Sequence, residues 1–222
     1  MKIRSQILTA VVLVLISTNV CFGFDDKGFQ YWAAAKVSLD INKDWKAVFA
    51  EQFKLGDDGG NLYYRHSDIG FVYKGLADWV DLGINFKQAY EKDSKDRWKQ
   101  ENRPHFNITF KGKLFGLNVA DRSRLEYRDR ENRDDMWRYR NKFTIKFPTE
   151  LTALKLRPYI ADEIFINLDH EDLNRNRLYA GVSFDLSEDM TAGLYYMWQS
   201  SRSSSENWND IYVLGTSLTF SF

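Results

Sequence analysis

The sequence predicts an all-β, single-domain, antiparallel transmembrane β-barrel of the bacterial outer-membrane type, with about 10–12 strands. Apolar and polar residues alternate with the period of a β-strand from residue 31 to the C-terminus. Most alternating segments span ten to thirteen residues, whereas soluble strands average about five or six and membrane strands need about nine to eleven. The final segment, 212–222, closes on an aromatic residue, Phe222. Together these features predict strands that cross a membrane.

Eleven segments carry the alternation, and polar connections separate them. The apolar rows fall at 31–41, 45–55, 69–73, 80–86, 106–110, 117–127, 137–147, 154–166, 178–186, 190–198 and 212–222. Short turns are expected near 42–44, 75–78, 112–116, 148–153 and 187–189. Longer loops are expected at 56–61, 91–101, 129–135, 169–174 and 201–209. Short turns at one end and long loops at the other are typical of outer-membrane barrels.

The number of segments conflicts with a rule for such barrels. Single-chain bacterial barrels have an even number of strands. Eleven rows therefore predict that one segment lies outside the wall or that one hides a second strand. Ten or twelve strands would satisfy the rule, and twelve is the preferred expectation.

The N-terminus predicts export. Residues 1–23 resemble a secretory signal peptide, with Lys2 and Arg4 before an apolar run that is too short to span a membrane. Cleavage after Gly23 leaves 24–222 as the barrel and removes Cys21, the sole cysteine. We therefore expect the bacterial cell outer membrane of a Gram-negative envelope as the location.

The composition excludes several other classes. The 31 Lys and Arg balance the 31 Asp and Glu, so no global positive field favours a nucleic-acid partner. One Cys and three Pro exclude a disulfide-stapled or collagen-like chain. Aromatic residues make up 16%, and we expect many of them in two interfacial girdles: Trp45, Trp79, Phe115 and Phe147 at the short-turn end, and Trp98, Trp137, Trp198 and Trp208 at the loop end.

Many of the residues that alternate with the apolar rows are charged. In a membrane barrel these alternate residues face the lumen. Arg–carboxylate pairs could tie the strands together in a structural barrel. Alternatively, the Arg bias could give a porin-like, anion-leaning eyelet. The predicted lumen-lining charged residues are His66, Asp68, Asp81, Lys87, Arg103, His105, Arg122, Arg124, Glu126, Arg128, Arg138, Arg140, Lys142, Arg157, Glu163, Arg175, Arg177 and Asp185.

Three polar residues break the apolar rows. Glu51, Asp121 and Ser123 occupy positions that the alternation assigns to the lipid-facing side of their segments. We expect a β-bulge that turns them inward or a position near a headgroup, with contact to another envelope component as a third option.

The sequence offers little for catalysis. A barrel enzyme acting on envelope lipid or peptide would need His66 or His105 beside a nucleophile or carboxylate. His66 and Asp68 share a strand face and could pair, whereas Ser67 points to the other face. The acidic loop around His170 offers at most weak cation binding. We expect no enzyme activity, no catalytic residue, no metal and no cofactor.

Several segments resemble an uncharacterised bacterial outer-membrane family called domain of unknown function 2490. The segments are 45–53, 66–74, 82–90, 122–128, 137–143, 156–165 and 175–184, and they follow one another along nearly the whole barrel region. The resemblance implies an outer-membrane barrel and no activity or ligand. The expected partners are outer-membrane lipid, lipopolysaccharide, and the assembly machinery that would read the strand ending at Phe222. The oligomeric state is not predicted.

Overall fold

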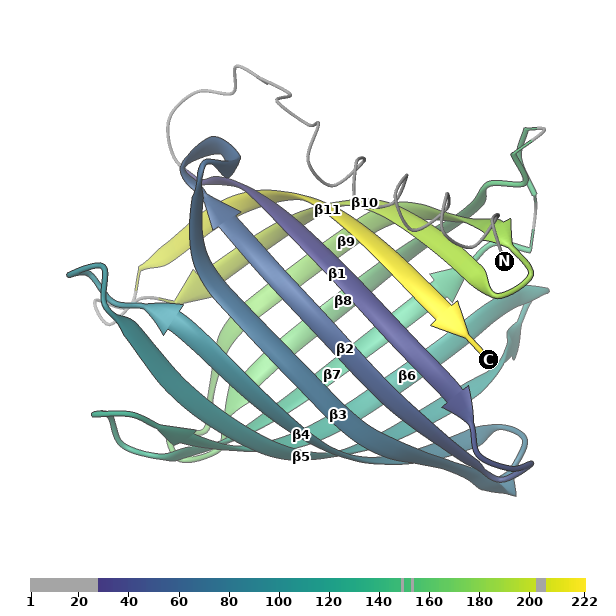
Figure 1. The fold of residues 1–222 in the computed structure, drawn as a ribbon, viewed down its shortest axis with the longest axis horizontal. Helices are drawn as coiled ribbons and strands as arrows, with labels where there is room; N and C mark the ends of the chain where they lie inside the picture. Colours follow the sequence, from purple (N-terminus) through teal and green to yellow (C-terminus); the bar gives the residue numbers. More distant parts are fainter. Residues whose placement is uncertain (1–27, 149, 153, 203–206) are drawn as a thin grey trace, which may run out of the picture.

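The computed structural model describes residues 28–148, 150–152, 154–202 and 207–222, which form one closed β-barrel (Figure 1). Its elements are β1 (Phe29–Asp40), β2 (Trp45–Gly56), the short 3-10 helix η1 (Asp57–Gly59), β3 (Asn61–Ala77), β4 (Val80–Lys92), β5 (Trp98–Leu114), β6 (Leu117–Arg130), β7 (Met136–Lys146), β8 (Arg157–Asn167), β9 (Asp172–Ser187), β10 (Met190–Arg202) and β11 (Trp208–Ser221). The predicted signal peptide lies outside the described residues. No helix among them is long and apolar enough to cross a membrane.

A parallel seam closes the barrel. Consecutive strands pair antiparallel, whereas β1 pairs parallel with β11, from Phe29 opposite Tyr212 to Ser38 opposite Ser221 (Figure 1). The expectation of ten or twelve strands is therefore wrong, since the described residues form eleven. Even numbers follow only when the first and last strands pair antiparallel. The wall thus begins at one end of the barrel, called here the Phe29 end, and finishes at the other, the Ser221 end.

The wall carries its apolar side chains on the outer face. Ile69 and Ile84 are 57% and 65% exposed, whereas the charged residues of the neighbouring parity are buried in the lumen. The predicted all-β barrel is thus confirmed. Exposed aromatic residues lie toward both rims: Trp45, Trp79, Phe115 and Phe147 toward the Ser221 end, and Trp98, Trp137 and Trp208 toward the Phe29 end.

The strands are longer than predicted, and the connections at the Phe29 end are correspondingly short. Strand lengths run from 11 to 17 residues. The strand bounds fall within a few residues of the predicted loops at 56–61, 91–101, 129–135, 169–174 and 201–209, so the loop positions are confirmed and only their lengths are overestimated. The short turn predicted at 148–153 is wrong, because β7 ends at Lys146 and β8 begins only at Arg157. β3 and β5 begin eight residues before their first apolar-row residues, Ile69 and Phe106. Polar side chains on the outer face of these extensions, among them Ser67 and Asn102, interrupt the apolar rows there although pairing with β4 continues.

Asp93 shows how such a short connection is held. Its carboxylate accepts hydrogen bonds from the backbone N–H groups of Lys95 and Arg97 at 2.8 and 3.1 Å, and from the Arg97 guanidinium at 3.0 and 2.8 Å. These bonds, foremost those from the Arg97 side chain, lower the pKa of Asp93 to about 2. An Asp that binds its own following backbone groups favours a tight turn.

The three residues that break the apolar rows do not sit at bulges. Strand register is continuous through Glu51, opposite Ser67, and through Ser123, opposite Asn141. The expected inward turn is therefore wrong, and these side chains stay on the outer face. Asp121 and Ser123 are satisfied there instead, because Asn141 Nδ2 donates to Asp121 Oδ1 at 2.5 Å and Ser123 Oγ bonds to the Tyr139 hydroxyl at 2.8 Å.

A small apolar cluster fills the lumen beside the seam. This seam cluster consists of Trp32, Met197 and Val213, with Tyr179, Tyr195 and Ile211 packed against it. Gly215 makes room for it, because a Cβ at this position would collide with the ring of Tyr195 on the neighbouring strand. The absence of a side chain at residue 215 therefore lets an aromatic ring lie flat across the backbone, as in aromatic rescue of strand glycines.

Gly215→Ala is expected to lower the free energy of unfolding by about 1–3 kcal/mol, since overpacking forces the Tyr195 ring out of place. Equilibrium unfolding in urea of detergent-folded protein measures the change. Gly112→Ala is the matched control, because an added Cβ there meets no atom within 4 Å. Equal unfolding midpoints for the two variants would contradict the packing of Tyr195 over Gly215.

Candidate functional site: a charged belt across the lumen

A closed ring of hydrogen bonds joins β3, β4 and β5 inside the lumen. Asn85 Nδ2 donates to Asp68 Oδ1 at 3.0 Å, and His105 Nε2 lies 3.1 Å from Asp68 Oδ2. Asn107 Nδ2 lies 3.0 Å from Asn85 Oδ1 and 3.1 Å from His105 Nδ1. The pattern fits a neutral His105 that donates from Nε2 and accepts at Nδ1. Gly70 allows the ring to form, since a Cβ there would collide with Asn85.

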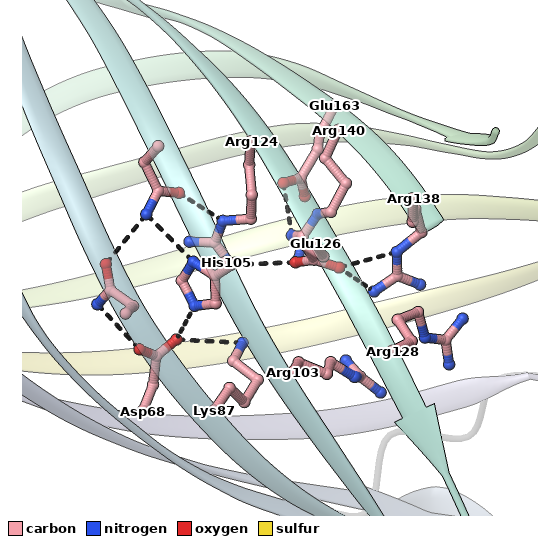
Figure 2. A network of polar contacts seen from close by, with 12 residues as sticks. Asp68, Lys87, Arg103, His105, Arg124, Glu126, Arg128, Arg138, Arg140 and Glu163 are labelled. Carbon is pink, nitrogen blue, oxygen red and sulfur yellow. Dashed lines mark hydrogen bonds and ion pairs between the residues drawn. The ribbon is translucent and has the colours of Figure 1, made fainter. Parts of the chain in front are cut away.

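Arg124 links this ring to two buried glutamates. Its Nε donates to Asn107 Oδ1 at 2.6 Å, and its Nη1 to Glu126 Oε1 at 3.3 Å. Figure 2 shows Glu126 with Arg124 on one side and Arg138 on the other. Arg138 donates twice to Glu126 Oε2, at 2.9 and 2.5 Å, and Arg140 bridges Glu126 and Glu163 at 2.8 and 2.7 Å.

Glu163 is the second centre of the network. Its carboxylate also accepts hydrogen bonds from Arg122 at 3.1 Å, from Arg177 at 3.4 Å and from the Tyr179 hydroxyl at 2.9 Å. Glu126 and Glu163 are only 0% and 2% exposed. We call this network, which spans β3 to β9, the lumen belt: Asp68, Asn85, Lys87, His105, Asn107, Arg122, Arg124, Glu126, Arg138, Arg140, Glu163, Arg177 and Tyr179.

The lumen belt and the seam cluster meet at Tyr179, which bonds to Glu163 and packs against the cluster. Two cavities lie on either side of them. The Ser221-end cavity measures about 470 Å³ and the Phe29-end cavity about 330 Å³, and no residue lines both. His105, Glu126 and Glu163 line neither cavity, which is consistent with their place inside the belt between the two.

The structure brings most of the predicted lumen residues into the belt or against it. Arg103 and Arg128 share Glu101 near the Phe29 end, Arg175 and His66 line the Phe29-end cavity, and Lys142 Nζ lies 3.9 Å from the Tyr179 ring centroid. Two pairs stand apart near the Ser221 end: Asp81 with Lys111 at 2.7 Å, and Arg157 with Asp185 at 2.8 and 2.5 Å.

His66 and His105 do not pair as the sequence predicts, since the expected partners were His66 and Asp68. Asp68 pairs with His105 and Lys87 across strands, and it forms no hydrogen bond or ion pair with His66. Both ring nitrogens of His105 are engaged, by Asp68 and Asn107, and its side chain is fully buried. In the part of the chain that the structure describes, no group of three or more His, Cys, Asp or Glu side chains could hold a metal ion.

Sequence reasoning missed several lumen residues. Lys54 and Trp32 belong to rows that look small or apolar, and Glu101 fell within a predicted loop. Phe165 lies on the inward parity of β8, where it is 1% exposed among charged neighbours. A signal for three of them is present in the sequence. Trp32, Lys54 and Phe165 alternate with the apolar residues of the rows at 31–41, 45–55 and 154–166, which places their side chains on the inward face.

A closed β-barrel with exposed apolar side chains and a network of buried charges across its lumen is the class that this fold and site define. The family model described as protein of unknown function (DUF2490) matches residues 29–210, and the chain belongs to this family. The resemblance found in the sequence is thereby confirmed. No curated protein matches the chain.

Proposed function

We propose that the protein is an outer-membrane barrel of the Gram-negative envelope whose lumen is closed, so that it serves as a structural or interaction barrel and not as a pore. The observation that carries the proposal is the pair of buried glutamates, Glu126 and Glu163, which join arginines from β6, β7 and β9 across the lumen. Buried charges that are fully paired hold one arrangement firmly, because breaking any pair leaves a desolvated charge.

The outer face supports insertion into a lipid bilayer. Large apolar side chains are exposed around the wall, and exposed aromatic residues lie toward both rims, as in the girdles of membrane barrels. A signal peptide at 1–23 would bring the chain to the envelope, and the strand ending at Phe222 would engage the assembly machinery. The proposed outer-surface partners are lipid and lipopolysaccharide. Engagement of both His105 nitrogens favours a structural role for this residue.

Planar-bilayer recording of the purified protein tests the proposal. We expect no opening events above baseline in potassium chloride, because the belt and the seam cluster separate the two cavities. Heat-modifiable electrophoretic mobility and resistance to carbonate extraction verify folding and insertion, and a general porin is the positive control. Resolved single-channel openings would overturn the closed lumen, and failure to insert would overturn the membrane location.

A further inference from the structure

The Phe29-end cavity has a surplus of positive charge. Eight cationic side chains line it: Lys54, Lys87, Arg103, Arg128, Arg138, Arg140, Arg175 and Arg177. Glu91 also lines it, and four further carboxylates contact these cations from the wall or the belt: Asp68, Glu101, Glu126 and Glu163. Eight cations against five carboxylates leave at least three positive charges uncompensated among the described residues.

Two of these cations make no ion pair with any described residue. Lys54 Nζ lies 3.8 Å from the Trp32 ring centroid and 4.2 Å from that of Tyr64. Arg175 donates from Nε to Ser201 Oγ at 3.0 Å and lies against Phe165. Their positions are thus fixed by aromatic faces and one neutral hydrogen bond, which leaves charged N–H donors available to a ligand.

His66 gives a second, independent observation. It lines the same cavity, it is only 9% exposed, and its Nδ1 has no hydrogen-bond partner among the described residues. Buried polar atoms in folded proteins nearly always have a partner, so an unsatisfied one beside a cavity points to a group that the cavity receives.

We propose that the Phe29-end cavity binds a small water-soluble polyanion that carries phosphate or carboxylate groups. Arginine forks bind both groups through paired, charge-assisted hydrogen bonds, and Lys54 adds a point charge. The volume of about 330 Å³ lies at the lower limit of ligand pockets, about 300–1,000 Å³, so the cavity suits a compact molecule. Binding at this cavity does not require a solute to pass the lumen belt. The proposed binding is therefore independent of whether the lumen is closed.

Isothermal titration calorimetry of the folded barrel in detergent and 150 mM sodium chloride (about the physiological ionic strength) tests the proposal with pyrophosphate and citrate as probes. We expect saturable binding of one or both, and no binding of a neutral disaccharide. The double variant Lys54→Gln/Arg175→Gln is expected to weaken binding at least about tenfold, because it removes charge-assisted donors. The charge-conserving variant Lys54→Arg/Arg175→Lys is expected to retain most of the affinity.

The matched control is Lys36→Gln/Lys46→Gln, which removes two cations from the Ser221-end cavity. Its affinity is expected to stay within about twofold of the wild type, because neither lysine lines the Phe29-end cavity. Absence of saturable binding by the folded wild type would overturn the proposal. So would a larger loss in the control variant than in Lys54→Gln/Arg175→Gln.

Discussion

Glu126→Gln is expected to lower the free energy of unfolding of the barrel by about 3–5 kcal/mol, one of the two largest effects that the structure predicts. Glu126 has no exposed surface and accepts hydrogen bonds from Arg124, Arg138 and Arg140. The neutral amide removes the charge that compensates three guanidinium groups, and its NH₂ group faces donors where an acceptor is required. Equilibrium unfolding in urea of the lipid- or detergent-folded protein, at low and high sodium chloride, measures the change.

Asp185→Asn is the matched control for this prediction. Asp185 forms a two-bond pair with Arg157 near the Ser221 end, but their side chains are 51% and 34% exposed. Exposed pairs contribute about 0–1 kcal/mol and are screened by salt. We therefore expect a small, salt-sensitive effect for Asp185→Asn and a large, salt-insensitive one for Glu126→Gln. Equal losses in the two variants would show that the belt is no more important to stability than a surface pair.

Phe165→Ala is expected to cost about 3–5 kcal/mol, a second large effect, because it leaves a cavity and removes a shared aromatic face. The guanidinium centres of Arg140, Arg177, Arg138 and Arg175 lie 4.5, 4.6, 5.4 and 5.5 Å from the Phe165 ring centroid. An aromatic ring attracts cations through its quadrupole, by about 0.5–2 kcal/mol for each well-placed group. Urea unfolding with intrinsic fluorescence as the probe measures the loss.

Phe165→Leu separates ring electrostatics from packing. Leucine keeps much of the volume but lacks the quadrupole, so we expect a loss of about 1–2 kcal/mol. Phe106→Leu is the matched control, because Phe106 is exposed on the outer face and no cation of the described residues lies over its ring. It should change stability by no more than about 0.5 kcal/mol. If Phe165→Leu matched this control, the ring would not be stabilising the four guanidinium groups.

The alternation in the sequence predicts which side chains share the lumen, and the belt residues named from it do lie on inward parity. It does not predict which of them pair. His66 and Asp68 are two positions apart on β3, a spacing that does allow a contact between His105 and Asn107 on β5. Asp68 nevertheless pairs with Asn85, Lys87 and His105 on the next strands, where cross-strand neighbours approach to about 5 Å. Such partners depend on strand register, which the pattern alone does not contain.

The strand boundaries and the seam were predicted less well, for physical reasons. The alternation is clearest where the outer face is apolar, so residues 98–101 at the start of β5 resemble the end of a loop in the sequence. Parallel closure leaves no signal in local periodicity, since Tyr31 and Thr216 meet at a separation of 185 residues. No residue in the sequence therefore indicates that the number of strands is odd.

The odd strand number has a topological consequence. A chain that crosses a bilayer eleven times leaves it on the side opposite to the one where it entered. In a membrane, Phe29 and Ser221 would face different compartments, whereas the two ends of an even-stranded wall share one. If the barrel is inserted into a bilayer as proposed, one terminus of the wall would have to cross the full thickness of that bilayer, in addition to the hairpins that every membrane barrel carries across.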